Sequence, residues 1–261
     1  MAVKLPTLPS RVGLIIGVAN KRSLAWSIAQ AVSLEGASLA FTYQNERLRE
    51  NVEKLAGGLA DPLVLPCDLN DDAQIDAVFT AIEEKYHGLD FVVHSAAFAE
   101  REALSKPFSE TSRDAFRTSL EVSAYSLVAV ARRAAPLLAK SPSARILTLS
   151  FLGSERVFPN YNVMGVAKAA LESSVRYLAS EFGPRGIRVN AISAGPVKTL
   201  AASGVSGFSD FLKTYEQRAP IGRNITAADV AEAALFLLGP AGRAITGQVI
   251  MVDGGYSIMG V

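Results

Sequence analysis

The sequence predicts an α/β fold with a doubly wound parallel sheet of about seven strands flanked by helices. Short apolar runs alternate with longer amphipathic segments from one end of the chain to the other. The apolar runs are continuous, which is typical of parallel strands that helices cover on both faces. No linker, internal repeat or low-complexity stretch interrupts this order, so we expect a single domain over residues 1–261.

The order of the segments shows where a site should lie. Strands are expected at residues 12–17, 38–42, 63–65, 89–94, 145–149, 187–192 and 248–252. Helices are expected at residues 24–35, 46–55, 72–86, about 112–140, 161 to about 182, 210–217 and 227–238. Ligands of such folds bind beyond the carboxyl ends of the strands, so the residues that follow each strand are the candidates.

Composition argues against several classes of protein. The net charge of +1 gives no reason to expect a nucleic-acid or anionic-membrane partner. No apolar run reaches the roughly 18 residues of a membrane helix, and residues 1–9 lack the apolar stretch of a secretory signal. The one cysteine, Cys67, excludes an internal disulfide and suits a reducing cytoplasm. We expect no metal site and structural roles for His87 and His94, because neither has a cysteine cluster as partner.

The stretch 150–168 contains the two residues most typical of catalysis, Tyr161 and Lys168. Seven residues separate them, which is close to two turns of a helix of about 3.6 residues per turn, so both side chains are expected on one helix face. A fixed ammonium lowers the pKa of a nearby phenol, which would make Tyr161 a competent proton donor or oxyanion partner. The alternative is an ordinary amphipathic helix with a half-buried tyrosine and a surface lysine.

The end of the first expected strand suggests a phosphate site. Gly17 allows a tight turn and close backbone approach, and Ser23 can cap the helix that begins beside it. The N-terminus of that helix offers N–H groups and a positive dipole end to a pyrophosphate. Only the first glycine of the usual G-x-G-x-x-G pattern is present, so a plain strand-to-helix turn is the alternative.

The next two strand ends carry polar residues that suit a nucleoside. Gln44 can hydrogen-bond a ribose hydroxyl but offers no charge to a 2′-phosphate, which favours NAD over NADP. Arg47 and Arg49 could bind such a phosphate, although we favour solvated helix charges. Asp68 can accept a hydrogen bond from an adenine amino group, or it can cap the helix that follows.

The fourth and sixth strand ends are built from small residues. Residues 95–97 would let a ribose and a nicotinamide lie against the backbone, with tight helix packing as the alternative. Gly195 begins a sharp glycine–proline turn, and Thr199 with the backbone near Val197 could hold a carboxamide. The small, glycine-rich run 201–208 suits a mobile lid over an apolar pocket, or a simple surface loop.

Together these motifs resemble the short-chain dehydrogenase/reductase superfamily over nearly the whole chain, and most closely the bacterial NADH-dependent enoyl-[acyl-carrier-protein] reductases. The resemblance rests on the runs 17–25, 41–45, 160–168, 188–196, 199–204 and 252–255. It implies a Rossmann-type oxidoreductase of fatty-acid biosynthesis, and so of lipid metabolism. It also implies NADH as cofactor, an enoyl thioester on acyl carrier protein as substrate, a cytoplasmic location, and a homotetramer built on long helices and the C-terminal segment.

The resemblance also implies roles for individual residues. Tyr161 would hydrogen-bond the thioester carbonyl oxygen, and Lys168 would hold the nicotinamide ribose. The residues implied to contact the dinucleotide are Gly17, Ser23, Leu24, Gln44, Asp68, Leu69, Ser95, Ala96, Lys168, Val197, Lys198, Thr199, Leu200 and Ala201. Those implied to contact the substrate are Ala99, Phe151, Tyr161 and Met164, under a lid near residues 199–215.

The sequence departs from the family pattern at three places. Phe151 stands where the family usually has a second active-site tyrosine, ten residues before Tyr161. Residues 96–97 are Ala-Ala where Ile-Gly is usual, which narrows the space beside the nicotinamide. The lid helix begins Ser-Gly-Phe-Ser-Asp at residues 206–210, without the basic residues that some members are thought to direct at the carrier protein.

Two other functions stay open from the sequence. A β-ketoacyl reductase or other alcohol dehydrogenase of the superfamily generally pairs the tyrosine with a serine hydroxyl, which Phe151 cannot supply but Thr148 or Ser150 could. A non-catalytic dinucleotide sensor would also keep the fold, although the presence of both Tyr161 and Lys168 argues against it.

Overall fold

Seven parallel strands form one sheet at the centre of the molecule, in the order β3-β2-β1-β4-β5-β6-β7. The computed structural model describes residues 8–199 and 207–260. The strands are β1 Val12–Ile16, β2 Ser38–Tyr43, β3 Leu63–Pro66, β4 Phe91–His94, β5 Arg145–Ser150, β6 Arg188–Ala194 and β7 Val249–Val252. The doubly wound parallel sheet expected from the continuous apolar runs is confirmed.

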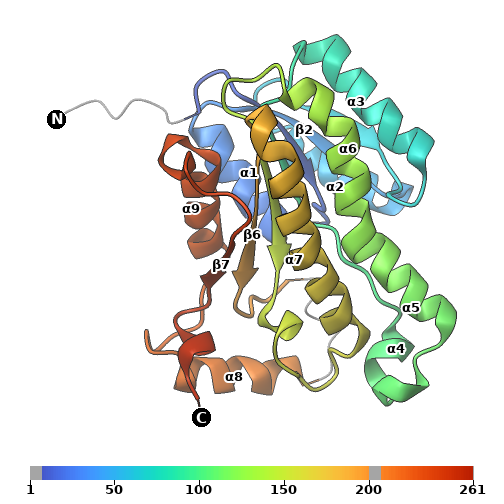
Figure 1. The fold of residues 1–261 in the computed structure, drawn as a ribbon, viewed down its shortest axis with the longest axis vertical. Helices are drawn as coiled ribbons and strands as arrows, with labels where there is room; N and C mark the ends of the chain where they lie inside the picture. The colour runs from blue at the N-terminus through green and yellow to red at the C-terminus, as the bar shows by residue number, and fades with distance from the viewer. Residues whose placement is uncertain (1–7, 200–206, 261) are drawn as a thin grey trace.

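Helices cover both faces of this sheet (Figure 1). One apolar core lies between the sheet and α1, α2 and α9, and a second lies between the other face and α3, α6 and α7. The α-helices are α1 Leu24–Leu34, α2 Glu46–Ala56, α3 Asp72–Tyr86, α4 Arg101–Ser105, α5 Arg113–Leu120, α6 Ser126–Leu138, α7 Val163–Phe182, α8 Phe208–Arg218 and α9 Ala227–Leu238. None of the described helices is both long and apolar enough to cross a membrane.

The strand order reverses between β1 and β4, which places a crevice at their carboxyl ends. Ile16, the last residue of β1, pairs with His94, the last residue of β4. Further across the sheet, Ser150 of β5 pairs with Ser193 of β6 at the same edge. This edge is the lower end of the molecule in Figure 1, where α8 and α4 also lie.

The long helical stretch expected over about residues 112–140 is present and consists of three contiguous segments. A π-helical turn, Glu121–Tyr125, separates α5 from α6. Inside this region the Ser126 hydroxyl donates to the carbonyl oxygen of Val122 at 2.6 Å. Such turns are tolerated where side chains supply the missing hydrogen bonds, and hydrophobic spacing alone does not reveal them because they shift the helix face by one residue.

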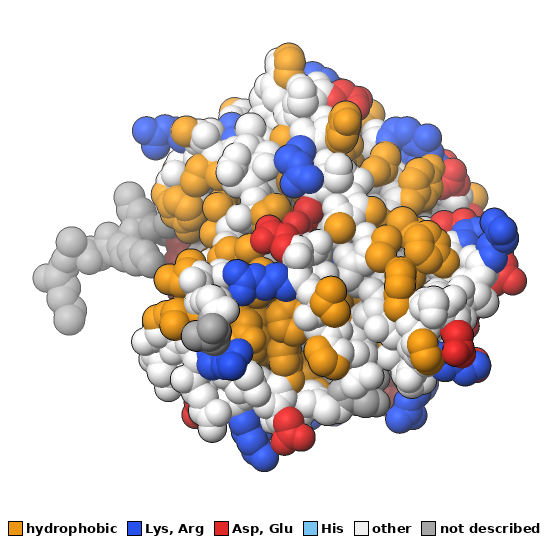
Figure 2. Space-filling view, turned by 60° about the horizontal axis from the view of Figure 1, so that its bottom comes forward, with side chains coloured by type: hydrophobic (Ala, Val, Ile, Leu, Met, Phe, Trp, Pro, Cys, Tyr) orange, Lys and Arg blue, Asp and Glu red, His pale blue; other side chains and the backbone are white. Residues whose placement is uncertain are grey.

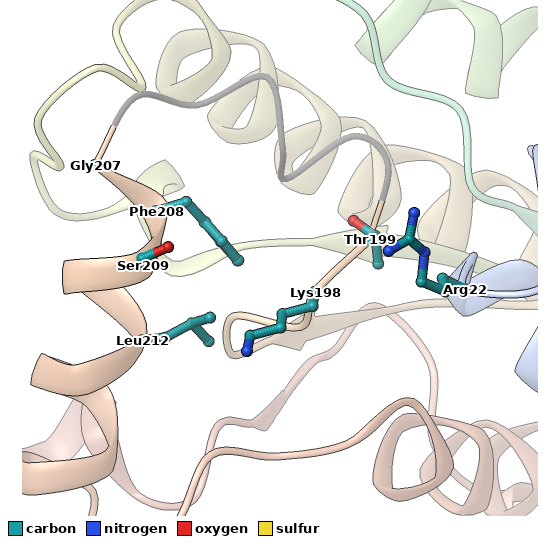
Figure 3. Close-up of a pocket in the computed structure, with 7 residues that line it drawn as sticks. All are labelled: Arg22, Lys198, Thr199, Gly207, Phe208, Ser209 and Leu212. Atoms are coloured by element: carbon teal, nitrogen blue, oxygen red, sulfur yellow. The ribbon is translucent and has the colours of Figure 1, made fainter.

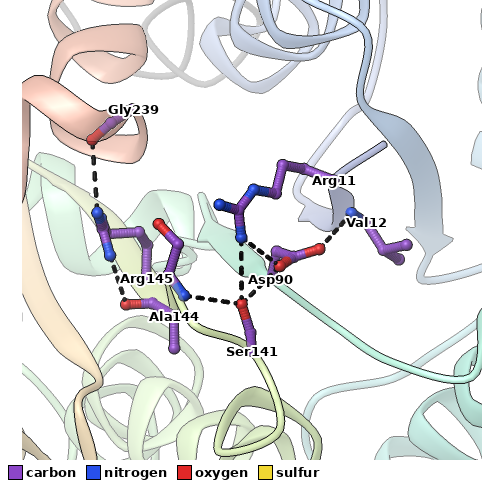
Figure 4. A network of polar contacts seen from close by, with 8 residues as sticks. Arg11, Val12, Asp90, Ser141, Ala144, Arg145 and Gly239 are labelled. Atoms are coloured by element: carbon purple, nitrogen blue, oxygen red, sulfur yellow. Dashed lines mark hydrogen bonds and ion pairs between the residues drawn. The ribbon is translucent and has the colours of Figure 1, made fainter. Parts of the chain in front are cut away.

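A polar network fastens the opposite, amino end of the sheet (Figure 4). The Asp90 carboxylate accepts from the Arg11 guanidinium at 2.7 Å, from the Val12 amide at 2.8 Å and from the Ser141 hydroxyl at 2.5 Å. These bonds join β1 to the turns that precede β4 and β5. The stabilising network therefore lies at the end of the sheet away from the candidate site.

Candidate active site

The turn after β1 needs a glycine. Gly17 has a φ of +96°, which side-chain-bearing residues rarely adopt. A Cβ atom added there would lie 2.2 Å from the carbonyl oxygen of Ser95, which follows β4. The backbone of this turn therefore lies directly against the end of β4, at the point where the strand order reverses.

Ser23 closes the turn rather than capping the helix, so the predicted cap is wrong. Ser23 is the N-cap residue of α1, but its side chain makes no cap hydrogen bond. Its hydroxyl oxygen instead accepts from the amides of Ala19 at 3.0 Å and Asn20 at 3.1 Å. The first turn of α1 carries no acidic side chain, so the positive end of its dipole suits an anionic ligand.

The next two strand ends place Gln44 and Asp68 at the same edge of the sheet. Gln44 is exposed beyond β2, while Arg49 pairs with Glu53 at 2.8 Å and Glu46 at 3.5 Å along the surface of α2. Asp68 does not cap α3, because the cap is Asp71, which accepts from the amides of Ala73 and Gln74. The capping alternative for Asp68 is therefore wrong, and its carboxylate accepts from Asn70 within the same turn.

A cavity of about 390 Å³ lies between the sheet edge and α8 (Figure 3). Arg22 from the β1–α1 turn and Lys198 and Thr199 from the segment after β6 line one side of it. The start of α8 lines the other side through Gly207, Phe208, Ser209 and Leu212. Two cations and an apolar helix face thus meet over one cavity. Leu200 and Ala201, which were expected to contact the dinucleotide, lie outside the described residues.

Tyr161 lies on a turn before α7, so the prediction that it shares a helix face with Lys168 is wrong. The helix begins at Val163, and both Asn160 and Asn162 have positive φ values, +62° and +40°. Asparagine tolerates this region better than most residues. The Asn162 amide donates to the carbonyl oxygens of three residues around the end of α4: Ala103, Leu104 and Lys106.

The ring of Tyr161 lies in an aromatic and glycine-lined space. It meets the Phe151 ring edge-on at 4.9 Å between centroids, and a Cβ atom at Gly153 would lie 2.5 Å from it. Burial and the charge of Glu172 both raise the pKa of Tyr161 above its ordinary value. The predicted lowering of this pKa by Lys168 is therefore wrong, and Tyr161 carries its proton at neutral pH as a hydrogen-bond donor.

Lys168 is buried on the inner face of α7, at the carboxyl end of β5. Its ammonium donates to the carbonyl oxygen of Leu149 at 2.7 Å. Burial lowers its pKa to about 8, and the nearby Glu172 carboxylate opposes that shift. The alternative of a surface lysine is excluded, because only 6% of Lys168 is exposed.

The two hydroxyls that could have served as the serine of an alcohol-forming reductase, those of Thr148 and Ser150, are both hydrogen-bonded to other groups. Ser150 donates to the Glu172 carboxylate at 2.5 Å. The Thr148 hydroxyl lies 3.1 Å from both the carbonyl oxygen and the Nδ1 atom of His94. Neither hydroxyl is therefore available to a substrate in this arrangement.

His94 is enclosed behind the site. Its Nε2 atom lies 2.9 Å from the Ser126 hydroxyl, which itself donates to the carbonyl oxygen of Val122. Burial and Lys168 lower the pKa of His94 to about 3, which keeps the ring neutral. In the part of the chain that the structure describes, no group of three His, Cys, Asp or Glu side chains could hold a metal ion.

Aromatic rings connect Tyr161 to α8. Phe151 contacts Phe158 at 4.9 Å and Phe211 of α8 at 5.9 Å, and Phe158 contacts Phe211 at 5.2 Å. Met164, the second residue of α7, lies beside the Ser123 hydroxyl, and Ala99 packs on a small cluster that includes Val163. In the space-filling view of this end, hydrophobic side chains gather in a hollow with Lys and Arg side chains beside it (Figure 2).

Sequence reasoning missed two residues of this site, Glu172 and Asn162. Glu172 and Lys168, four residues apart, are the two charged residues on the largely apolar inner face of α7, and this break in the amphipathic pattern was the available signal for Glu172. Asn162 carried no such signal, because its role depends on a backbone conformation that only the fold reveals.

A parallel sheet with a glycine turn at the strand-order reversal, and with Tyr161 and Lys168 at the same edge, defines a dinucleotide-dependent reductase of the short-chain type. The family described as enoyl-(acyl carrier protein) reductase matches residues 17–257. The chain belongs to this family.

Several characterised relatives are similar over nearly their whole length. The chain is 50% identical over 249 residues to enoyl-[acyl-carrier-protein] reductase [NADH] 1 of Rhizobium meliloti, covering 95% of this chain and 91% of that protein. It is 47% identical over 246 residues to the Escherichia coli K12 enoyl-[acyl-carrier-protein] reductase [NADH], covering 94% of this chain and 93% of the relative.

Solved structures of the family superpose closely on this one. The Bacillus cereus enoyl-acyl carrier protein reductase, solved with NADP⁺ and an indole naphthyridinone, has a TM-score of 0.95 at 47% identity, covering 98% of this chain and 99% of that one. The Anaplasma phagocytophilum enzyme in complex with NAD has a TM-score of 0.93 at 47% identity, covering 97% and 96%.

Proposed function

We propose that this chain is an NADH-dependent enoyl-[acyl-carrier-protein] reductase that reduces the double bond of a trans-2-enoyl thioester in fatty-acid synthesis. The observation that carries the proposal is the placement of Tyr161 and Lys168 at the same sheet edge as the glycine turn of β1, in a chain that belongs to this family. The names of the relatives, which specify NADH and acyl carrier protein, support the choice of cofactor and substrate.

The residues of the site fit a dinucleotide along the sheet edge. The Gly17 turn and the uncapped start of α1 would bind the pyrophosphate, with Arg22 near it, and Gln44 would bind the adenosine ribose. Lys168 would hold the nicotinamide ribose. The other residues proposed to contact the dinucleotide are Ser23, Leu24, Asp68, Leu69, Ser95, Ala96, Val197, Lys198 and Thr199. The bound cofactor supplies the hydride, and the protein supplies position and electrostatics.

Tyr161 is the residue that we propose acts on the substrate. Negative charge develops on the thioester carbonyl oxygen as the β-carbon is reduced, and a neutral hydroxyl can donate a hydrogen bond to that oxygen. The raised pKa of Tyr161 supports this role, because the hydroxyl keeps its proton at neutral pH. Protonation of the α-carbon completes the reduction.

The aromatic side chains beside Tyr161 are proposed to bind the acyl chain. Phe151, Met164 and Ala99 would form one wall, and Phe211 of α8 would form another, because its ring lies 5.9 Å from that of Phe151. In this proposal α8 covers the acyl chain, and residues 199–215 form the substrate lid of a single domain. Three further features are proposed on the family resemblance: docking of acyl carrier protein, assembly as a homotetramer and a cytoplasmic location.

An alcohol-forming reductase is the second candidate, and one observation argues against it. Such an enzyme needs a hydroxyl beside the tyrosine, whereas Ser150 and Thr148 are engaged with Glu172 and His94. The test is NADH oxidation with a crotonyl thioester and an acetoacetyl thioester, with NADPH in parallel. Turnover of the crotonyl thioester alone supports the proposal. Turnover of the acetoacetyl thioester alone contradicts it, and NADH binding without turnover of any enoyl thioester would indicate a sensor.

A further inference from the structure

A carboxylate that the proposed reaction does not use lies buried behind the site. Glu172 is on the inner face of α7, one turn after Lys168, and 5% of it is exposed, as is 6% of Lys168. A buried carboxylate costs free energy unless a cation or hydrogen bonds compensate its charge. The ammonium of Lys168, one helical turn away, supplies the compensating charge.

Two consecutive residues of β5 hold this pair of charges in place. The carbonyl oxygen of Leu149 accepts from the Lys168 ammonium at 2.7 Å. The hydroxyl of the next residue, Ser150, donates to the Glu172 carboxylate at 2.5 Å. Both charged side chains are therefore fixed to the carboxyl end of the same strand.

We propose that Glu172 is a positioning residue, which holds the Lys168 ammonium at the carboxyl end of β5 where a dinucleotide ribose binds. This inference rests on the proposed function for the identity of the ligand. Glu172 acts through Lys168 and touches neither the cofactor nor the substrate. The Lys168 ammonium has three N–H donors. One of them binds the carbonyl oxygen of Leu149, which leaves the others for ribose hydroxyls.

The electrostatics of the pair agree with this role. Burial lowers the pKa of Lys168 to about 8, and the Glu172 charge raises it. Without that charge the pKa would fall further, and Lys168 would lose its proton closer to neutral pH. The same charge raises the pKa of Tyr161, so one carboxylate favours both a charged lysine and a protonated tyrosine.

In the described structure, Glu172 is the charged side chain that raises the pKa of Lys168. His94 from β4 is neutral, with a pKa of about 3, and Tyr161 carries its proton. Charged residues on the other elements around α7 are engaged elsewhere: Arg117 with Asp114 and Glu121, Arg133 with Asp72 and Asp76, Arg156 with the carbonyls of Ser257 and Met259, and Arg185 with the carbonyl of Ala135.

The test is a pH titration of NADH binding to the parent enzyme and to Glu172→Gln, followed by NADH fluorescence without substrate. Lys168 is an ammonium below its pKa, so the two proteins should bind NADH alike at pH 6. As pH rises, the variant should weaken about one pH unit before the parent, which gives a dissociation constant roughly threefold to tenfold higher near pH 8. Glu172→Asp, which keeps the charge, should restore most of the parental profile.

A purely structural role would give a different result. It would raise the dissociation constant by the same factor at every pH, and that outcome overturns the inference, as does an unchanged profile. Glu181→Gln is the matched control, because Glu181 is exposed on the same helix. If Glu172→Gln does not fold, Glu172→Ala, which removes the same charge, is titrated in its place, and an unshifted profile refutes the inference.

The proposed function and the role of Glu172 can be contradicted independently. A parent enzyme that binds NADH but does not reduce crotonyl thioester contradicts the proposed function and leaves the NADH titration interpretable. A parent enzyme that reduces the thioester while Glu172→Gln keeps the parental pH profile contradicts the role of Glu172 alone.

Discussion

Tyr161 and Lys168 do not interact in the way that their spacing suggests. A positive φ at Asn162 starts α7 two residues after Tyr161, so the two side chains reach the site from a turn and from a helix. Lys168 is directed to β5 by its bond to Leu149. Tyr161 thus remains a neutral hydrogen-bond donor, and Lys168 remains a buried cation. The two residues therefore have separate proposed contacts: Tyr161 with the substrate and Lys168 with the ribose.

Tyr161→Phe should keep the fold and the NADH affinity and lower kcat/KM by on the order of 10²-fold or more. The reason is that the hydroxyl is used strongly only when charge develops on the carbonyl oxygen, so its loss removes transition-state stabilisation. Steady-state kinetics with a crotonyl thioester measure the effect. Tyr177→Phe on the exposed side of α7 is the control, and an unchanged kcat/KM in Tyr161→Phe would remove this tyrosine from the mechanism.

Lys168→Ala should raise the NADH dissociation constant, because it removes charge-assisted hydrogen bonds to the ribose. It also leaves Glu172 buried without its cation, so thermal unfolding must be measured beside binding. Lys140→Ala is a suitable control, since Lys140 pairs with Glu83 at the surface. If Lys168→Ala binds NADH as tightly as the parent enzyme, the ribose contact is wrong.

The residues after β2 predict a preference for NADH over NADPH of more than tenfold in kcat/KM. Gln44 offers no charge to a 2′-phosphate, and a missing charge-assisted hydrogen bond removes roughly 1.5–3 kcal/mol. Glu46 adds a like-charge repulsion of about 1 kcal/mol, and each 1.4 kcal/mol is about tenfold. Arg49 is held by Glu46 and Glu53, which reduces its availability to the phosphate.

Kinetics with both cofactors and one enoyl thioester measure this preference. Gln44→Arg should move it toward NADPH, and Gln30→Arg on the exposed side of α1 is a control of equal charge. An equal or larger kcat/KM with NADPH in the parent enzyme would mean that Gln44 does not select the cofactor, and Arg47 would then be the next residue to change.

At the scale of elements, the sheet and most helices were predictable because their signals are local. The strands appear as apolar runs within a few residues of their bounds, and α3 and α9 begin and end where expected. The π-helical turn at Glu121–Tyr125 and the start of α7 were not predictable, because side-chain hydrogen bonds and non-glycine residues in the left-handed region decide them. These two departures lie at the site, where local rules most often give way to function.

The amino end of the sheet gives a stability prediction that is independent of catalysis. Asp90→Ala should lower the free energy of unfolding by about 2–4 kcal/mol, because it breaks bonds from Arg11, Val12 and Ser141. Chemical denaturation measures the loss. Because the network lies at the opposite end of the strands from the site, the variant should keep the parental kcat/KM under native conditions. Asp76→Ala, at an exposed position of α3, provides the control. A large fall in kcat/KM without loss of stability would contradict this separation.

At the scale of the whole molecule, α7 leaves large apolar side chains exposed on its outer surface, beside α6. Tyr177 is 78% exposed, and it lines a groove between these helices with Val128, Ala170 and Leu178. At the far end of the chain Ile258 is 79% exposed, while Tyr256 stacks on Tyr215 of α8 at 3.6 Å. The C-terminal segment is thus attached to the helix that we propose covers the substrate.

The family resemblance predicts a homotetramer, and these exposed apolar side chains suit its subunit contacts, because large apolar patches left on a surface usually mark an interface. Light scattering at micromolar concentration should give four times the mass of one chain. Tyr177→Glu should reduce that mass, since it places a charge in the groove between α6 and α7, whereas Leu34→Glu, at an equally exposed apolar position on α1, should leave it unchanged.

A monomer mass for the parent enzyme would refute the assembly. A tetramer that survives Tyr177→Glu would place the contact elsewhere, and Ile258→Glu would then test the C-terminal segment.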